Sequence, residues 1–449
     1  MVFSLIPLVL ALGAMIRSKV VLTFQFMLVI YALMSYIIPI LALSYFPWYL
    51  ETISQYDGSI DSEINWALMA LGDIAAVQIA LILAGYKETN FTLNLKALHV
   101  RRAVGIGFAL VFIMMFFVHV LGTGKYDDGN MTANPVAQLL QPQYVVFILV
   151  VYALNYKIIQ QKSTTLYGVK PLVVLYLVFA VSSGSRSGLV NLLLIYIAVW
   201  VLLVGKFQVR HYFSMFIISV LAVLLFIVAT MLRGGSDMDM STVFYHADNL
   251  YDAVIIYVVK RIGLHENLYQ IANGFYSAQI YNEIGLLQFV KSTFDLLVPG
   301  TYFLGVYPLA ALNQIWLYGY DLARIATEWS SISVGLYSVN YLYFGKFFGW
   351  FVTVLITYLY VKYSERLISK YQSGWQAYFG IYMIFSFQPY FLTSFGYEYL
   401  IRGLVMGAAN IYFWHWLIIR KSRSRVGLQD MQCTGKGSPV DLPQSRDLS

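Results

Sequence analysis

Five arginines are the residues of this sequence whose type and position best suit chemistry. They lie near the ends of strongly apolar segments or within one long, more polar segment at residues 233–345: Arg186, Arg233, Arg261, Arg324 and Arg402. The planar guanidinium group forms paired hydrogen bonds to a phosphate or a carboxylate. Arginines gathered at one membrane surface therefore favour binding of a pyrophosphate head group. For each arginine alone, pairing with a local acid or anchoring at the membrane surface is the alternative.

Arg186 lies in a turn of Ser and Gly, residues 182–188, between two apolar segments. Small residues let helix ends approach a ligand, and the start of the next helix offers an anion its free N–H groups and the positive end of its dipole. The alternative is a plain turn whose arginine reaches the lipid head groups. We expect this turn to contribute to the anion site.

His265 and Glu266 are the proton acceptors that the long segment offers for a hydroxyl attacking a sugar carbon. Apolar side chains recur at helical spacing through residues 264–281 and predict an amphipathic helix: Leu264, Leu268, Ile271 and Phe275. Arg261 and His265 would lie beside its apolar stripe, and Glu266 on its polar face. Such a helix lies on the membrane surface or covers a cavity, and a simple amphipathic anchor is the alternative.

Three other acids give weaker signals. Asp237 and Asp239 could bind a metal, but any acidic loop supplies this spacing by chance, so no metal site and no cofactor is predicted. Asp73 is the only acid placed well inside an apolar segment, where charge is costly and often functional. One buried acid is too few for a proton relay.

The composition indicates which elements must position these residues. Of 449 residues, 59% are hydrophobic and 11% are charged, which excludes a water-soluble domain with an ordinary surface. A bilayer core of about 30 Å needs roughly 20 apolar residues per helix, and these continuous runs do not alternate as barrel strands do. We predict an all-α polytopic membrane protein of about eleven transmembrane helices. They lie at residues 2–16, 20–46, 64–85, 103–122, 143–156, 168–184, 187–205, 212–232, 346–363, 375–394 and 401–419.

The basic residues predict the orientation of these helices. Most of the 29 Lys and Arg residues fall in alternate loops and in the tail, which places those loops in the cytoplasm. No charge precedes the first apolar run, and Arg17 and Lys19 follow it, so a retained span with its N-terminus outside is expected instead of a signal peptide. The net charge of +7 then faces anionic lipids, and no nucleic acid partner is expected.

This topology divides the chain into four regions. Residues 1–232 carry the first eight spans, and residues 233–345 form one long outer segment containing amphipathic helices. Residues 346–419 carry the last three spans, and residues 420–449 are expected to be a disordered basic cytoplasmic tail. The single cysteine, Cys433, lies in this tail, so no intramolecular disulfide is possible.

Several short motifs carry a family resemblance. They are Gly184-Ser-Arg186-Ser-Gly188, His265-Glu266-Asn267-Leu268, Ser333-Val-Gly335 to Tyr343-Phe-Gly345, Arg324 followed after ten residues by Gly335, and Arg402 after Gly396-Tyr397-Glu398. With these motifs, the chain resembles the Wzy-type O-antigen or oligosaccharide repeat-unit polymerases of bacterial inner membranes, and more distantly the O-antigen ligases. The resemblance covers the topology throughout and the motifs in patches.

The resemblance implies glycosyl transfer at the periplasmic face, so the long segment would be a periplasmic loop. The growing glycan on undecaprenyl pyrophosphate would be the donor, and the terminal hydroxyl of a new lipid-linked unit the acceptor. The five arginines would bind pyrophosphate, and Glu266 or His265 would be the base. Membrane lipids and a chain-length regulator protein are the further partners it implies.

Two alternatives stay open. One is an O-antigen ligase or another glycosyltransferase that depends on polyprenyl phosphate. The other belongs to a different class, a flippase or transporter of lipid-linked oligosaccharides. Transporters place polar sites at mid-membrane on broken helices, often in paired repeats, whereas the polar residues here gather on one face.

Overall fold

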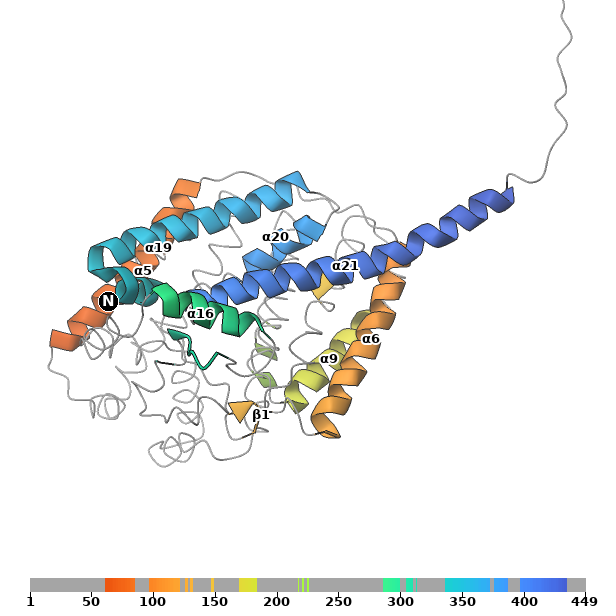
Figure 1. The fold of residues 1–449 in the computed structure, drawn as a ribbon, viewed down its shortest axis with the longest axis horizontal. Coiled ribbons are helices and arrows are strands. Elements are labelled where there is room, and N and C mark those ends of the chain that lie inside the picture. The colour runs from red at the N-terminus through yellow and green to blue at the C-terminus, as the bar shows by residue number, and fades with distance from the viewer. Residues whose placement is uncertain are drawn as a thin grey trace, which may run out of the picture.

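The computed structural model describes a subset of the chain. The described residues are 61–84, 97–121, 126–127, 130–131, 147–148, 169–183, 217, 220–221, 224–225, 286–298, 304–309, 312, 336–371, 375–386 and 396–433. They are mostly helical, with one small antiparallel hairpin, β1 (Tyr126–Asp127) and β2 (Asn130–Met131), and short turns and irregular stretches such as residues 304–308. Figure 1 shows the helices as separate rods, with α21 leaving the body of the molecule at its C-terminal end.

Seven helices have described bounds. They are α5 (Asp61–Ala84), α6 (Ala97–His119), α9 (Val169–Ser182), α16 (Leu286–Leu297), α19 (Leu336–Lys370), α20 (Trp375–Ser386) and α21 (Tyr397–Cys433). All but α16 overlap apolar segments that the sequence predicts to be spans, although α19 begins before its predicted span and α21 continues to Cys433, into the tail that was expected to be disordered. The other five predicted spans, and the amphipathic helix predicted at residues 264–281, lie wholly or largely outside the described residues. Helix α16 belongs to the long segment but follows that predicted helix.

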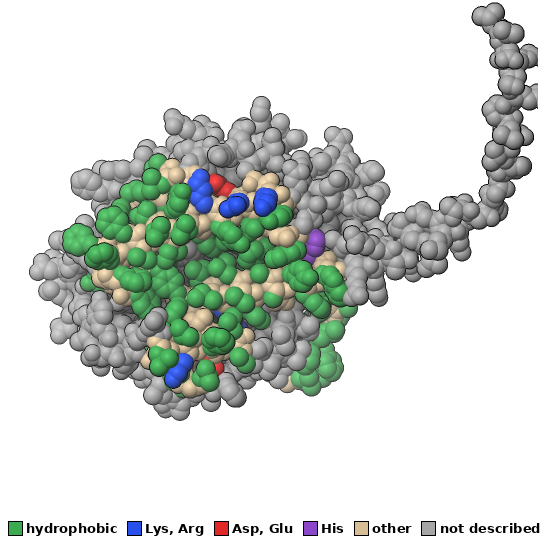
Figure 2. All heavy atoms as spheres, turned by 45° about the horizontal axis from the view of Figure 1, so that its top comes forward, with side chains coloured by type: hydrophobic (Ala, Val, Ile, Leu, Met, Phe, Trp, Pro, Cys, Tyr) green, Lys and Arg blue, Asp and Glu red, His purple; other side chains and the backbone are tan. Residues whose placement is uncertain are grey.

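Two of the described helices are long and apolar enough to cross a membrane. They are residues Arg102–His119 of α6 and Phe347–Lys370 of α19. Gly72–Ala84 in α5 and Lys170–Ser182 in α9 are shorter apolar stretches. Hydrophobic side chains cover most of the described surface in Figure 2, and most of the basic side chains in that view gather near its upper edge. A surface of this kind is typical of contact with lipid or protein rather than with water.

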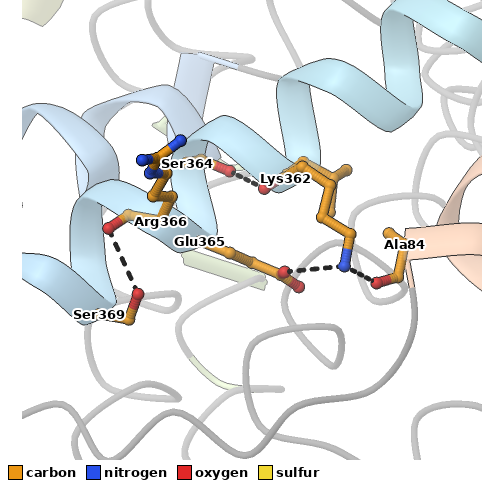
Figure 3. Close-up of polar contacts among 7 residues, drawn as sticks. Ala84, Lys362, Ser364, Glu365, Arg366 and Ser369 are labelled. Carbon is orange, nitrogen blue, oxygen red and sulfur yellow. Dashed lines mark hydrogen bonds and ion pairs between the residues drawn. The ribbon is translucent and has the colours of Figure 1, made fainter.

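Helices α5 and α19 run side by side in the same direction. The indole Nε1 of Trp350 donates a hydrogen bond of 3.0 Å to the carbonyl oxygen of Gly72. Twelve residues further along both helices, the Lys362 ammonium donates to the carbonyl oxygen of Ala84, the last residue of α5 (Figure 3). The same ammonium lies 3.9 Å from the Glu365 carboxylate. Lys362 therefore satisfies a carbonyl at the end of α5 and joins the two helices.

Asp73 supports the other end of α19. Its side chain is buried on α5, and its Oδ1 accepts a hydrogen bond of 3.3 Å from the backbone N–H of Tyr337. Tyr337 is the second residue of α19, where N–H groups have no partner within the helix. The acid placed inside a span by the sequence thus caps a neighbouring helix, which gives it a structural role.

Helix α19 is broken at Gly345, whose φ of 75° and ψ of 178° are not helical. The first segment folds back on the second, because a Cβ atom on Gly349 would lie 2.7 Å from the carbonyl carbon of Asn340. Asn340 Nδ2 donates a hydrogen bond of 2.7 Å to Thr353 Oγ1 across the bend. The break falls directly before residue 346, where the sequence predicts that a span begins.

Helix α20 returns along α19. The Tyr360 hydroxyl donates a hydrogen bond of 2.8 Å to the carbonyl oxygen of Met383. Earlier in α20, a Cβ atom on Gly380 would lie 2.9 Å from the Cβ atom of Leu367, later in α19. The two helices are therefore antiparallel and closely packed.

Helix α21 in turn packs antiparallel to α20. The Tyr382 hydroxyl donates a hydrogen bond of 3.4 Å to the carbonyl oxygen of Gly403. At the other end of the contact, the rings of Trp375 and Tyr412 meet edge to face with centroids 5.4 Å apart. Close approach depends on Gly407, where a Cβ atom would lie 2.3 Å from the Tyr382 ring. Together α19, α20 and α21 form an up-and-down arrangement with α5 alongside α19.

Candidate functional site

A buried carboxylate at the start of α21 joins three distant parts of the chain. Glu398 is 2% exposed. Its Oε1 accepts hydrogen bonds from Ser292 Oγ at 3.5 Å, from the backbone N–H of Leu309 at 3.3 Å and from Tyr343 Oη at 3.4 Å. These donors belong to α16, to the following loop and to the first segment of α19. We call Glu398, Ser292, Leu309 and Tyr343 the Glu398 cluster.

The local backbone sets the position of Glu398. Gly396 has a φ of +105°, a conformation that side chains other than that of Gly rarely adopt. A Cβ atom there would also lie 2.7 Å from Glu398 Oε2. The helix begins at once, since the N–H of Leu400 donates to the Gly396 carbonyl oxygen at 3.2 Å. A carboxylate in the first turn of a helix is favoured by the positive end of the helix dipole.

Burial dominates the electrostatics of the cluster. Removal of the Glu398 carboxyl from water raises its pKa above the ordinary value, although hydrogen bonds from its own backbone N–H, Leu309, Tyr343 and Ser292 act in the opposite direction. Burial also raises the pKa of Tyr343, and the neighbouring Glu398 charge adds to that effect. Tyr343 is thus held as a proton donor to the carboxyl. Glu398 Oε2 has no hydrogen-bond partner among the described residues.

A chain of polar contacts extends the Glu398 cluster into α19. The rings of Tyr343 and Tyr397 lie with centroids 5.8 Å apart. The Tyr397 hydroxyl donates to Asn340 Oδ1, and Asn340 donates to Thr353 in turn. Thr353 Oγ1 then donates a hydrogen bond of 2.8 Å to the carbonyl oxygen of Gly349. The start of α21 is therefore fixed to both segments of the bent α19.

Helix α16 covers the Glu398 cluster with its polar face. Ser292, Thr293 and Asp295 are all buried. Asp295 Oδ2 accepts a hydrogen bond of 2.9 Å from the N–H of Leu304, beside Gly305, whose φ is +63°. The loop from Leu304 to Leu309 is thus held by one carboxylate on α16 and by one on α21. The sequence predicts amphipathic helices within residues 233–345 but did not place one at Leu286–Leu297, although the apolar residues there recur at helical spacing.

Of the predicted site residues, Arg402 lies in the described part of the chain. It stands four residues after Glu398 on α21, so both side chains lie on the same side of the helix, and it is partly exposed. The remaining predicted site residues lie outside the described residues: Arg186, Arg233, Arg261, Arg324, His265 and Glu266. The structure therefore places a buried acid that was not predicted as a site residue, Glu398, one helical turn before the predicted Arg402.

A second polar contact lies at the ends of α6 and α9. His119 Nε2 lies 3.0 Å from Ser182 Oγ, within hydrogen-bonding distance. Ser182 Oγ also donates to the carbonyl oxygen of Phe179 at 3.0 Å and so closes the last turn of α9. Ser182 is the first residue of the Ser/Gly turn that carries Arg186. His119 was not singled out from the sequence, where a lone His at the end of an apolar run gives little signal.

Glu398 was also missed as a site residue, although a usable signal existed. It lies between two tyrosines immediately before an apolar span, a costly position for an acid without partners. Within the described ranges, no group of three or more His, Cys, Asp or Glu residues could hold a metal ion. No protein family, curated protein or solved structure matches the chain. The described fold and site define a helical protein with two helices able to cross a membrane.

Proposed function

We propose that this chain is a multi-pass membrane glycosyltransferase that polymerises lipid-linked oligosaccharide repeat units at the outer face of a bacterial inner membrane. The donor is the growing glycan on undecaprenyl pyrophosphate. The acceptor is the terminal sugar hydroxyl of a new lipid-linked unit. The proposal rests on the eleven-span pattern and the motifs of the sequence, and on the polar assembly at the start of α21.

The observation that carries the proposal is that a predicted phosphate-binding residue, Arg402, lies close along α21 to the buried Glu398 cluster. Arg402 lies one helical turn from Glu398, which is buried and receives hydrogen bonds from α16, the following loop and α19. A cluster that fixes the start of a helix also fixes the residues of its first turns. Arg402 is thereby held on a rigid element, as a group that must orient a pyrophosphate requires.

The packing directions of the helices support the predicted topology. Spans 3 and 9 should both run from the outer face to the cytoplasm, and α5 and α19 are parallel. Spans 9, 10 and 11 should alternate, and α19, α20 and α21 are antiparallel in sequence. Spans 4 and 6 should both end outside, and α6 and α9 end together at His119 and Ser182. In that topology, the Glu398 cluster and the Arg186 turn share the outer face.

The proposed reaction balances without a metal. The acceptor hydroxyl oxygen forms a bond to the anomeric carbon of the donor sugar, while the bond from that carbon to the pyrophosphate oxygen breaks. The electron pair leaves with the pyrophosphate, and Arg186, Arg233, Arg261, Arg324 and Arg402 are proposed to stabilise its charge. The hydroxyl proton passes to Glu266 or His265. Pyrophosphate is a good leaving group, so this chemistry requires no cofactor.

Deletion of the gene followed by gel analysis of surface polysaccharide tests the function. A polymerase predicts that the ladder of chain lengths collapses to a single repeat unit. Loss of even that single unit would indicate the ligase. Accumulation of lipid-linked units that have not crossed the membrane would indicate the flippase. An unchanged ladder would contradict all three functions.

Alanine variants of the arginines test the site. Arg402→Ala, Arg186→Ala, Arg261→Ala and Arg324→Ala should each reduce long-chain polymer by about tenfold or more, because each removes a charged contact worth roughly 1.5–3 kcal/mol. Arg366→Ala is the matched control, since this exposed arginine lies on α19 in a predicted cytoplasmic loop. Expression and membrane insertion should stay normal in every variant. Normal polymer in all four test variants would refute the site.

A further inference from the structure

Helix α16 has the opposite arrangement to an ordinary surface helix. Its polar side chains Ser292 and Asp295 are 1% and 4% exposed, whereas its apolar side chains Leu287 and Phe294 are 68% and 63% exposed. In a protein surrounded by water, the apolar face of an amphipathic helix packs inward. An apolar face that points outward must be shielded from water by another apolar partner, and the described residues do not provide one.

The exposed residues of α16 and of the residue that follows it form one stripe. Leu287, Val290, Phe294 and Val298 are separated by three, four and four residues, the spacing that keeps side chains on one helix face. Lys291 is also exposed and borders this stripe. A lysine in that position can bury its stem along an apolar surface while its ammonium group reaches water or phosphate.

The stripe belongs to a helix that contacts α19, whose second segment is long and apolar enough to cross a membrane. Phe289 of α16 packs edge to face on Tyr343, with ring centroids 6.3 Å apart, at the start of α19. After the break at Gly345, α19 exposes apolar residues along one side: Phe347, Phe348, Phe351, Leu355 and Leu359. Figure 2 shows hydrophobic side chains spreading across the described face, with few charged groups between them. The exposed apolar residues of α16 and of α19 thus belong to two helices in direct contact.

We propose that α16 lies in the membrane surface, with the stripe Leu287, Val290, Phe294 and Val298 among lipid acyl chains and its polar face against the Glu398 cluster. Twelve residues of helix measure about 18 Å, too short to cross a hydrocarbon core of about 30 Å. The helix lies along the bilayer, as amphipathic helices do at interfaces. Lys291 at the border of the stripe matches the negative lipid phosphates.

In this placement, α16 connects the lipid to the start of α21. The hydrogen bond from Ser292 to Glu398 and the contact from Asp295 to Leu304 connect a lipid-embedded helix to the start of α21. Arg402 would then be held near the depth of the lipid head groups, where the pyrophosphate of a lipid-linked substrate lies. This last consequence rests on the proposed function, whereas the lipid contact of α16 does not.

Spin-label accessibility in lipid nanodiscs tests the proposal. Single cysteines are introduced in a Cys433→Ser background as Leu287→Cys or Phe294→Cys, with Phe351→Cys on α19 as a lipid-facing reference. Collisions of the nitroxide with oxygen, which concentrates in lipid, are compared with collisions with a water-soluble nickel chelate. We expect oxygen to dominate at positions 287 and 294, as at position 351. Lys291→Cys should show several-fold more contact with nickel than either position.

Two results would overturn the proposal. Strong nickel contact at positions 287 and 294 would place the stripe in water. Weak contact with both reagents would mean that protein, such as a second copy of the chain, covers the stripe. The substitutions lie on exposed positions, so they should not prevent folding. The accessibility measurement does not depend on polymer synthesis. Lipid contact of α16 can therefore be confirmed even if the gel assay rejects the proposed polymerase, and the gel assay can support the polymerase even if α16 does not contact lipid.

Discussion

Glu398 places a carboxyl group in surroundings that disfavour its charge. A carboxylate favours water, yet this one is almost fully buried and relies on a serine, a tyrosine and a backbone N–H for its hydrogen bonds. Buried polar groups that are joined in this way fix a single arrangement of the elements that supply the donors. Glu398 therefore acts as the point where α16, α19 and α21 are joined.

The raised pKa of Glu398 predicts a pH dependence of stability. The folded state binds the proton more tightly than the unfolded chain, whose carboxyl keeps the ordinary value of 4.5. The stability that this group contributes is therefore fully present below that value, and it is lost as the pH rises through the folded-state pKa. Thermal unfolding of the purified wild type and of Glu398→Gln, which cannot ionise, measures the difference across this range.

We expect the stability of the wild type relative to Glu398→Gln to fall as the pH rises. Parallel pH profiles for the two proteins would contradict the raised pKa. Glu398→Ala provides the control for hydrogen bonding, because it removes the acceptor of the Leu309 N–H and of the Tyr343 hydroxyl, whereas Ser292 keeps the carbonyl oxygen of Phe289 as an acceptor. It should be less stable than Glu398→Gln at every pH, by about 1–3 kcal/mol for each donor left buried without a partner.

At the scale of elements, the bend of α19 decides how the site is built. The segment before Gly345 supplies Asn340 and Tyr343 to the polar contacts, and the segment after it is apolar enough to cross a membrane. The two segments approach so closely that only a residue without a Cβ atom fits at Gly349. The bend thus brings polar residues back over the end of a helical segment that is long and apolar enough to cross a membrane.

Gly349→Ala tests the importance of this approach. The added Cβ atom would lie 2.7 Å from the backbone of Asn340, so the two segments of α19 must move apart. We expect a loss of at least about 2 kcal/mol in the free energy of unfolding, or a clear fall in melting temperature. Gly105→Ala on α6 is the matched control, because nothing lies within 4 Å of its added Cβ atom.

The control variant should be neutral or stabilised by up to about 1 kcal/mol, since alanine favours a helix more than glycine does. Equal melting temperatures for Gly349→Ala and the wild type would show that the bend is not tightly packed. Equal losses in both variants would point to a general effect of glycine replacement.

At the scale of the whole molecule, the charges and the helix directions point to the same orientation. Lys362, Arg366 and Lys370 lie at the C-terminal end of α19, while the Glu398 cluster lies against its N-terminal segment. Positive residues collect on the cytoplasmic side of membrane proteins. The polar cluster is therefore expected on the outer side.

Labelling with a membrane-impermeant maleimide in intact cells tests this orientation. Native Cys433 should react only after cell lysis, and so should Lys370→Cys in a Cys433→Ser background. Leu304→Cys, in the same background, should react in intact cells because Leu304 is exposed beside the Glu398 cluster. The reverse pattern would place the cluster in the cytoplasm and defeat both the topology and the proposed reaction.

Most of the described helices overlap predicted spans, whereas the partners of Glu398 could not be predicted. Apolar segments of sufficient length form helices because backbone groups in lipid must find hydrogen-bond partners within the segment, and this is a local property. The segments around residues 64–85, 103–122 and 346–363 accordingly coincide with α5, α6 and the second part of α19. Ser292 reaches Glu398 across 106 positions of the chain, and no local pattern encodes such a contact.

The sequence by itself determined that the chain is apolar, that its long apolar segments form helices, and that its basic residues collect in alternate loops. These are properties of local length, hydropathy and charge. Only the tertiary structure decided that Asp73 caps α19, that Glu398 joins three elements and that α16 turns its apolar stripe outward. Helical spacing reveals a stripe but not its direction. That direction depends on which groups far along the chain pack against the helix, here Glu398 against Ser292.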